Sequence, residues 1–238
     1  HRGFGVTRVV EHLFYTLEGV IGTPIGVCST FIVLFILFGA FLEKTGVGKF
    51  FIDIANAIAG HAPGGPAKVA IIASALEGTV SGSSVANTVG SGSFTIPMMK
   101  KTGYKPEFAA AVEAAASTGG QIMPPIMGAA AFLMAEMTNI SYARIILAAV
   151  IPAVLYFTTI LLQVHFEAKR LGLRGLPPEE IPRAWTLLKE KGHLFLAIIA
   201  IVVFLSAGFT DLFDQLRIQV QASNVAHGHA VVLTPHCG

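Results

Sequence analysis

The stretch Ser81-Gly-Ser-Ser-Val-Ala-Asn-Thr-Val-Gly-Ser-Gly-Ser93 is uncharged but polar, and it lies in the middle of a strongly apolar segment. Its thirteen residues include seven with hydroxyl or amide side chains and three glycines. Backbone that departs from a helix at membrane depth is tolerated only where it is buried in protein or lines a polar cavity. In membrane transport proteins this pattern marks an ion or substrate site, so we interpret the rest of the chain outward from this stretch.

The composition is that of an integral membrane protein. The 238 residues are 53% hydrophobic, with a mean hydropathy of +0.69, and only 13% are charged. Soluble domains have about 25% charged residues. A formal net charge of +2 is too small to indicate nucleic-acid binding, and two cysteines, Cys28 and Cys237, do not make a disulfide framework. These features predict an all-α integral membrane fold.

The polar stretch is central in the segment between Lys68 and Lys100, whose only charged residue is Glu77. As one straight helix these 31 residues would extend about 46 Å, beyond the roughly 30 Å hydrocarbon core. Two complete crossings would need about 40 residues. Both ends are basic, which places both in the cytoplasm. The segment therefore predicts a re-entrant hairpin over residues 67–100, with two half-length helices that meet at residues 81–88.

A second polar break lies in residues 107–138, which are uncharged from 108 to 135 except for Glu113. Its centre is Ser117-Thr-Gly-Gly-Gln-Ile-Met-Pro-Pro125. Adjacent glycines and adjacent prolines interrupt a helix, because glycine adds backbone freedom and proline removes a hydrogen-bond donor. The segment predicts one membrane crossing by a discontinuous helix.

Three further apolar runs predict transmembrane spans: residues 19–43, 143–166 and 192–210. Each approaches or exceeds the roughly 20 apolar residues that cross a bilayer. Residues 167–191 hold a cluster of Lys and Arg, so they predict a cytoplasmic loop. With these assignments, no loop violates the positive-inside bias.

Two segments predict helices that lie in the membrane interface, residues 1–18 and 47–61. On the second, the apolar face is expected to consist of Phe50, Phe51, Ile54, Ala55 and Ile58. Beyond residue 210 the apolar pattern stops abruptly. We expect residues 211–238 to be an atypical tail, disordered or artefactual, and assign it no function.

Two motifs carry a family resemblance. The first is Leu76-Glu-Gly-Thr-Val-Ser-Gly-Ser-Ser-Val-Ala-Asn-Thr88, followed by Phe94-Thr-Ile-Pro-Met-Met-Lys-Lys-Thr-Gly-Tyr104. The second is Glu113-Ala-Ala-Ala-Ser-Thr-Gly-Gly-Gln-Ile-Met-Pro-Pro125. Over roughly residues 8–209 the chain resembles the large, DctM-like membrane subunit of tripartite ATP-independent periplasmic (TRAP) transporters. The sequences of the two motifs are most similar to those of permeases in which the small and large subunits are fused.

This resemblance implies a multi-pass secondary transporter of the bacterial inner membrane that works by an elevator mechanism. Its implied partners are a periplasmic solute-binding protein and a small membrane subunit or fused equivalent. The implied coupling ion is Na⁺, the implied substrate is a small organic anion, mostly a carboxylate in this family, and no other cofactor is expected. Large subunits of the family hold two inverted halves, and this chain resembles one of them, so the remaining half is a further expected partner.

The two polar breaks supply candidate site residues, since Na⁺ is a hard cation that favours oxygen ligands. The candidate sodium ligands are Ser81, Gly82, Ser83, Ser84, Asn87, Thr88, Ser117, Thr118, Gly119 and Gly120. The candidate substrate-facing residues are Asn87, Gln121, Pro124 and Pro125. Two intramembrane acids, Glu77 and Glu113, are candidates for tuning the site or for structural hydrogen bonding. The alternative for all small residues is close helix packing, which we favour for residues 90–93.

Other functions stay open at this point. The chain could be a structural or assembly fragment that does not transport, or a permease subunit of an ATP-driven system. A nucleotide-binding Gly-x-x-x-x-Gly-Lys-[Ser/Thr] run does not occur in the sequence. No Ser/His, Asp/Asp or His-Glu-x-x-His pair lies within the spans, so we do not expect an enzyme, a catalytic residue, or a metal site beyond Na⁺.

Overall fold

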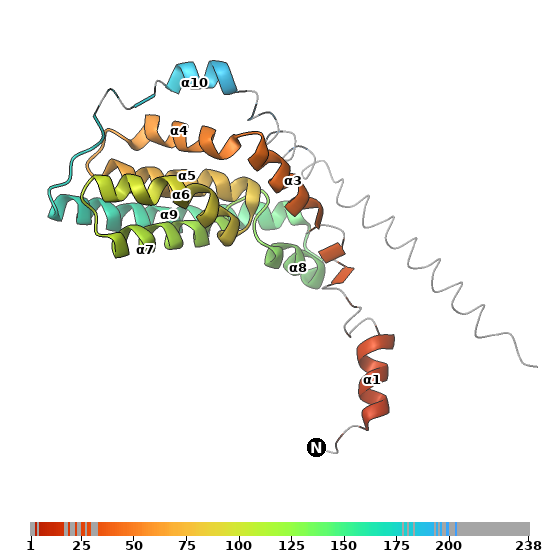
Figure 1. Cartoon of the computed structure of the whole chain (residues 1–238). Helices are drawn as coiled ribbons and strands as arrows, with labels where there is room; N and C mark the ends of the chain where they lie inside the picture. The colour runs from red at the N-terminus through yellow and green to blue at the C-terminus, as the bar shows by residue number, and fades with distance from the viewer. Residues whose placement is uncertain are drawn as a thin grey trace, which may run out of the picture. The chain divides into compact units, whose positions relative to one another are not determined.

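The computed structural model describes residues 33–177 without a gap, together with 5–16, 184–192 and isolated positions among 3–32 and 179–203. Within these residues the protein is helical throughout, and no strand occurs. The chain divides into two units, His1–Leu196 and Ala197–Gly238, and the helices below lie in the first. They are α1 (Val6–Tyr15), α3 (Val33–Lys44), α4 (Val47–Ala59), α5 (Gly65–Ser81), α6 (Ser84–Lys101), α7 (Pro106–Gly119), the 3₁₀ turn η2 (Gly120–Ile122), α8 (Ala129–Thr138), α9 (Tyr142–Arg170) and α10 (Ala184–Lys191) (Figure 1).

Helices α5 and α6 form a hairpin with a two-residue tip. Gly82 ends α5 in the left-handed conformation with φ +57°, which glycine adopts without steric cost. Ser83 then starts α6 as its N-cap, and its hydroxyl accepts a hydrogen bond from the Ala86 amide at 3.3 Å. The helical break is therefore limited to residues 82–83, and the expectation of a break over 81–88 was wrong for residue 81 and for residues 84–88. A serine at the N-cap allows the helix to begin directly after the glycine.

The hairpin helices are longer than the half-length helices expected from the sequence. With 17 and 18 residues, α5 and α6 each extend about 26 Å. Their extra length comes from the short tip and from the outer ends, where α5 starts at Gly65 and α6 continues to Lys101. Whether the hairpin is re-entrant is a question of membrane position and stays a prediction.

The second polar break separates α7 from α8. Helix α7 continues into η2, and an irregular segment with a cis Pro124–Pro125 peptide leads to α8 at Ala129. The Tyr142 hydroxyl, at the start of α9, donates to the carbonyl oxygens of Ile126 at 2.5 Å and Pro125 at 3.1 Å. These bonds satisfy backbone groups that the missing helical turns leave without partners. That α7 and α8 together form one crossing remains a prediction.

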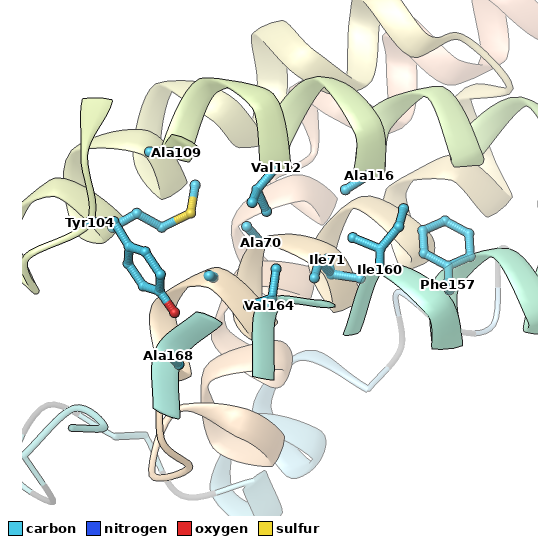
Figure 2. Close-up of a cluster of buried hydrophobic side chains, with 12 residues drawn as sticks. Ala70, Ile71, Tyr104, Ala109, Val112, Ala116, Phe157, Ile160, Val164 and Ala168 are labelled. Atoms are coloured by element: carbon cyan, nitrogen blue, oxygen red, sulfur yellow. The ribbon is translucent and has the colours of Figure 1, made fainter. Parts of the chain in front are cut away.

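A tightly packed core joins α5, α6, α7 and α9. Its buried members are Ala67, Ala70, Ile71, Met99, Tyr104, Ala109, Val112, Ala116, Phe157, Ile160, Val164 and Ala168. Figure 2 shows the larger side chains of α9, including Ile160 and Phe157, facing the alanines and valine of α7 and the start of α5. Alanine on two neighbouring helices lets their backbones approach closely, the usual way to pack helices in a membrane.

Helix α4 packs against α5, and its buried face differs from the expected one. Val47, Phe50, Phe51, Ile52, Ala55 and Ala59 are buried. Ile58, expected on the apolar contact face, is 55% exposed, and Ile54 is only partly buried. Ile52, Ala55 and Ala59 pack with Val69 and Ala73 of α5, so the buried face turns toward these residues and leaves Ile58 exposed.

Helix α9 covers the predicted span 143–166, and of the described helices it alone is long and apolar enough to cross a membrane. Helix α3 covers the second half of the predicted span 19–43, whose first half lies mostly outside the described residues. The predicted span 192–210 and the tail 211–238 also lie outside them, apart from isolated positions. Helices α1 and α10 lie in the predicted segments 1–18 and 167–191.

Candidate functional site

A cluster of hydroxyl groups surrounds the carboxylate of Glu113, which is fully buried on α7. From α6, Ser91 donates to Oε1 and Thr95 donates to Oε2, both at 2.5 Å. Ser117, one turn further along α7, and Ser74 of α5 donate to Oε1 at 3.3 and 3.4 Å. The two short distances are typical of charge-assisted hydrogen bonds. One side chain thus joins three helices.

Helical spacing explains why these groups meet. On α6, Asn87, Ser91 and Thr95 recur every fourth residue and therefore lie on one face. On α7, Glu113 and Ser117 have the same spacing and face them. A Cβ on Gly92 would lie 3.0 Å from Glu113 Cγ, so glycine at this position makes room for the acid. We define these groups, with Ser74, as the Glu113 cluster.

Asn87 connects this cluster to the second polar break. Its side chain is fully buried, and Nδ2 donates to the Ser74 carbonyl oxygen at 2.8 Å. A Cβ on Gly120 would lie 2.7 Å from Nδ2, and one on Gly78 would lie 2.5 Å from the Gly120 Cα. The hairpin and the break therefore meet backbone to backbone through two glycines, with the Asn87 amide beside them.

A cavity of about 720 Å³ lies at the hairpin tip. Its walls come from the tip, the irregular segment before α8, the first turn of α8, and α9. Gln121 lies at its polar edge, where Nε2 donates to Ser84 Oγ at 2.7 Å and the backbone oxygen accepts from the Gly128 amide at 2.7 Å. Helix α8 starts in this wall and α6 starts at Ser84, directly beyond the lining residue Ser83, so the positive ends of two helix dipoles lie at the cavity.

The structure brings together only part of the predicted site. Asn87, Ser117 and Gly120 lie at the hairpin–break contact, whereas Ser81, Gly82, Ser83 and Gln121 line the cavity. Ser84 lies at its edge, bonded to Gln121. The predicted residues named here therefore fall into two groups, one at the hairpin–break contact and one at the cavity.

Other predicted residues lie apart from both groups. The hydroxyls of Thr88 and Thr118 donate to carbonyl oxygens in their own helices, at 2.8 and 2.7 Å, and Thr118 is exposed. Gly119 faces α9, where a Cβ would lie 2.5 Å from the Tyr156 ring. The side chains of Pro124 and Pro125 shape the irregular segment and are not among the residues that line the cavity.

The two candidate acids have different surroundings. Glu113 is enclosed in the cluster, whereas Glu77, on α5, lines a separate cavity of about 260 Å³ beside α3 and α4. A group of three or more His, Cys, Asp or Glu side chains that could hold a metal ion is absent from the described residues. A cation at this site would therefore depend on hydroxyl, amide and carbonyl oxygens with a single carboxylate.

Sequence reasoning missed Ser74, Ser91 and Thr95, and assigned Ser91 to packing with its neighbours. Gly92 does pack closely, but Ser91 is a hydrogen-bond donor to Glu113. The four-residue spacing of Asn87, Ser91 and Thr95 was the available signal, because it places three polar groups on one helical face.

Comparison with known proteins identifies the family. Residues 4–231 match the family model of the tripartite ATP-independent periplasmic transporter, DctM component. The chain is 32% identical to the C4-dicarboxylate TRAP transporter large permease protein DctM of Pseudomonas aeruginosa, over 74% of this chain and 41% of that protein. It is 29% identical to the 2,3-diketo-L-gulonate TRAP transporter large permease protein YiaN of Escherichia coli, with the same coverage of 74% and 41%.

A third relative is the sialic acid TRAP transporter large permease protein SiaM of Vibrio cholerae, 27% identical over 75% of this chain and 41% of that protein. The chain therefore spans about two fifths of the length of these relatives. Both polar breaks, the hairpin and the buried acid all lie inside the matched region. The chain belongs to the DctM family of TRAP transporter permease components.

Proposed function

We propose that this chain forms one half of a sodium-coupled permease that imports a small organic anion, delivered by a periplasmic binding protein. In this proposal the permease lies in the bacterial inner membrane and moves its substrate by an elevator mechanism. It works with a small membrane subunit or fused equivalent and with the remaining half of the large subunit. The observation that carries the proposal is the cavity between the hairpin tip and the start of α8.

The shape and charge of this cavity suit an organic anion. Its volume of about 720 Å³ lies within the 300–1,000 Å³ typical of small-molecule sites. Two helices begin at it, and amide groups at helix N-termini favour anions. Gln121 adds a polar side chain that bonds to Ser84. The three relatives are named for a dicarboxylate, a gulonate and sialic acid, which supports a carboxylate as the substrate.

The hairpin–break contact is the proposed place of the sodium ion. Asn87, Ser117 and the backbone of Gly120 supply oxygens next to the substrate cavity, without an additional buried charge. An ion at this contact would hold the hairpin against α7. Because the hairpin tip lines the cavity, ion binding would then affect the shape of the cavity.

Transport by a permease of full family length that carries this segment tests the proposal. The permease is reconstituted in liposomes with its binding protein, and uptake of labelled succinate, 2,3-diketo-L-gulonate and sialic acid is measured with an inward sodium or choline gradient. We expect uptake of at least one acid, only with sodium and only with the binding protein. Uptake at the same rate with a sodium gradient and with a choline gradient would contradict the proposal, and so would uptake that requires ATP.

Two glutamine variants test the cavity assignment. Gln121→Ala removes the amide at the cavity and should raise the substrate KM about tenfold, the effect of losing one hydrogen bond to a charged ligand. Gln163→Ala removes an identical amide from the exposed surface of α9 and should leave KM unchanged. Equal KM values for the two variants would exclude this cavity as the substrate site.

A further inference from the structure

The smaller cavity has a volume of about 260 Å³, and no residue of the Glu113 cluster is among those that line it. It is enclosed by the end of α5 and the start of α6 on one side and by α3 and α4 on the other. Its polar lining consists of the Glu77 carboxylate and the serines Ser81 and Ser83. These serines also line the substrate cavity, so the hairpin tip borders both.

Glycines on two helices make room for the Glu77 carboxylate. A Cβ on Gly90 of α6 would overlap with Oε1, and one on Gly48 of α4 would lie 3.8 Å from the same atom. Any larger residue at Gly90 would force the acid out of its position. The residue Glu77 is 9% exposed, and it lines the cavity.

The backbone adds negative potential at the same place. Helix α5 ends at Ser81, and the last carbonyl groups of a helix carry partial negative charge and have no partner within the helix. The Val80 carbonyl oxygen faces α3, where a Cβ on Gly39 would lie 3.6 Å from it. A carboxylate, two hydroxyls and a helix C-terminus therefore surround one cavity, and each of these groups favours a cation.

We propose that this cavity is a second cation site, in which Glu77 and the α5 C-terminus hold a hydrated monovalent cation beside the hairpin tip. The inference rests on the proposed function for the choice of Na⁺. One carboxylate suits a monovalent ion, because Ca²⁺ and Mg²⁺ sites use several charged oxygen ligands. The volume exceeds that of a bare ion and leaves room for several waters at about 30 Å³ each.

Both helix ends at the tip border both cavities. Ser81 and Ser83 line each of them, and Ala86 in the first turn of α6 lines the smaller one. A cation in one cavity and an anion in the other would both contact Ser81 and Ser83. Filling both cavities would fix the tip.

Equilibrium binding of ²²Na⁺ to the purified full-length permease tests the site directly. Glu77→Gln removes the charge but keeps the shape, and we expect it to lower the number of bound ions by one or to weaken one class of site at least tenfold. Glu107→Gln neutralises an exposed acid at the start of α7 and should bind as the unmodified permease does. Unchanged binding by Glu77→Gln would overturn the proposal.

Two further variants test the same site without removing the charge of Glu77. Gly90→Ala retains the acid but displaces it, and Ala40→Phe fills the cavity from α3. Both should weaken the same class of site, and full binding by both would also overturn the proposal. At equal concentration, Mg²⁺ should displace little of the bound ²²Na⁺. If Mg²⁺ displaces most of it, the site is not monovalent and the proposal is contradicted.

The test separates this inference from the proposed function. Sodium-driven uptake with unchanged ion binding in Glu77→Gln would remove only the second site. Absence of sodium-driven uptake in the unmodified permease would contradict the proposed function, whatever the Glu77 variants bind.

Discussion

Glu113 is a buried acid. Its carboxylate accepts hydrogen bonds from the hydroxyl groups of Ser74, Ser91, Thr95 and Ser117. Hydroxyls stabilise a carboxylate without adding a second buried charge, and they can rotate to follow it. The acid therefore joins α5, α6 and α7 in the part of the molecule where the hairpin meets the second break. We propose that in this position it acts as a positioning residue for the ion site.

The stability of the permease should depend on this acid. Glu113→Leu leaves hydroxyls without their acceptor, although Ser91 and Thr95 keep carbonyl acceptors in their own helix at 2.8 and 3.0 Å. We expect a loss of about 2–3 kcal/mol, near the cost of one or two buried unsatisfied groups. Thermal unfolding in detergent measures it.

The matched variant Glu113→Gln keeps an acceptor oxygen and the side-chain shape. It should lose less than half as much stability as Glu113→Leu. If both variants unfold at the same temperature as the unmodified permease, the cluster does not stabilise the helix contact.

Tyr104, in the turn between α6 and α7, gives a prediction on pH. Burial raises its pKa to about 12, and within the described residues its hydroxyl has no hydrogen-bond partner. The raised pKa means that the neutral form is favoured in the folded state. Its contribution to stability is therefore complete below pH 10 and is lost as the pH rises toward 12.

Tyr104→Phe removes the unpaired hydroxyl and this titration. We expect equal or slightly higher stability at pH 7, because a buried polar group without a partner costs free energy. The difference between Tyr104→Phe and the unmodified permease should then grow between pH 10 and 12. A variant that is less stable than the unmodified permease at pH 7 would show that the hydroxyl has a partner.

At the scale of elements, the contact between Gly78 on α5 and Gly120 in η2 determines how closely the hairpin approaches the second break. A Cβ on either residue would come within about 3 Å of the other's backbone, and backbone has no flexible end that could move aside. Neither residue has a left-handed φ. Glycine is therefore required by the close approach of the two backbones and not by the backbone conformation.

Gly78→Ala should therefore separate the two elements, weaken the Asn87–Ser74 bond and reduce uptake at least tenfold. Gly5→Ala is the control, since a Cβ there would meet nothing within 4 Å and the residue has φ −65°, which alanine adopts without strain. The two variants are compared by thermal unfolding and by initial uptake rate. Equal behaviour of both would show that the close approach is not required.

The elements themselves were largely predictable, and their exact ends were not. Glycine and serine at 82–83 mark a helix end and an N-cap, but the many polar residues after them suggested a longer break than the structure has. The amphipathic pattern predicted a helix at 47–61, yet its buried face depends on how α5 packs against it, and local sequence does not contain that information. The Glu113 cluster was missed for the same reason, because its donors come from three helices.

At the scale of the whole molecule, composition predicted an all-helical membrane protein, and the family match confirms the DctM-like identity given by the two motifs. The side of the membrane on which each loop lies is still a prediction from charge. It can be tested with single cysteines in a permease in which Cys28, Cys237 and any further native cysteines are replaced by serine.

Exposed positions exist at three connections: Lys105, Asn139 and Leu171. We expect Lys105→Cys and Leu171→Cys to react with an impermeant thiol reagent only from the cytoplasmic side. Asn139→Cys, between α8 and α9, should react only from the periplasm, because α7–α8 is expected to cross once and α9 to return. Labelling of Asn139→Cys from the cytoplasm would contradict this topology.

The central claim is that the hairpin tip and the second break together form a sodium-coupled site, with Asn87 at their contact. The most direct test is the sodium concentration that gives half-maximal uptake in liposomes. Asn87→Ala should raise it about tenfold, as expected for one lost ligand worth about 1.4 kcal/mol. Asn56→Ala removes the same amide from α4, away from both breaks, and should leave the value unchanged. An unchanged value in Asn87→Ala, or an equal rise in both variants, would contradict the account.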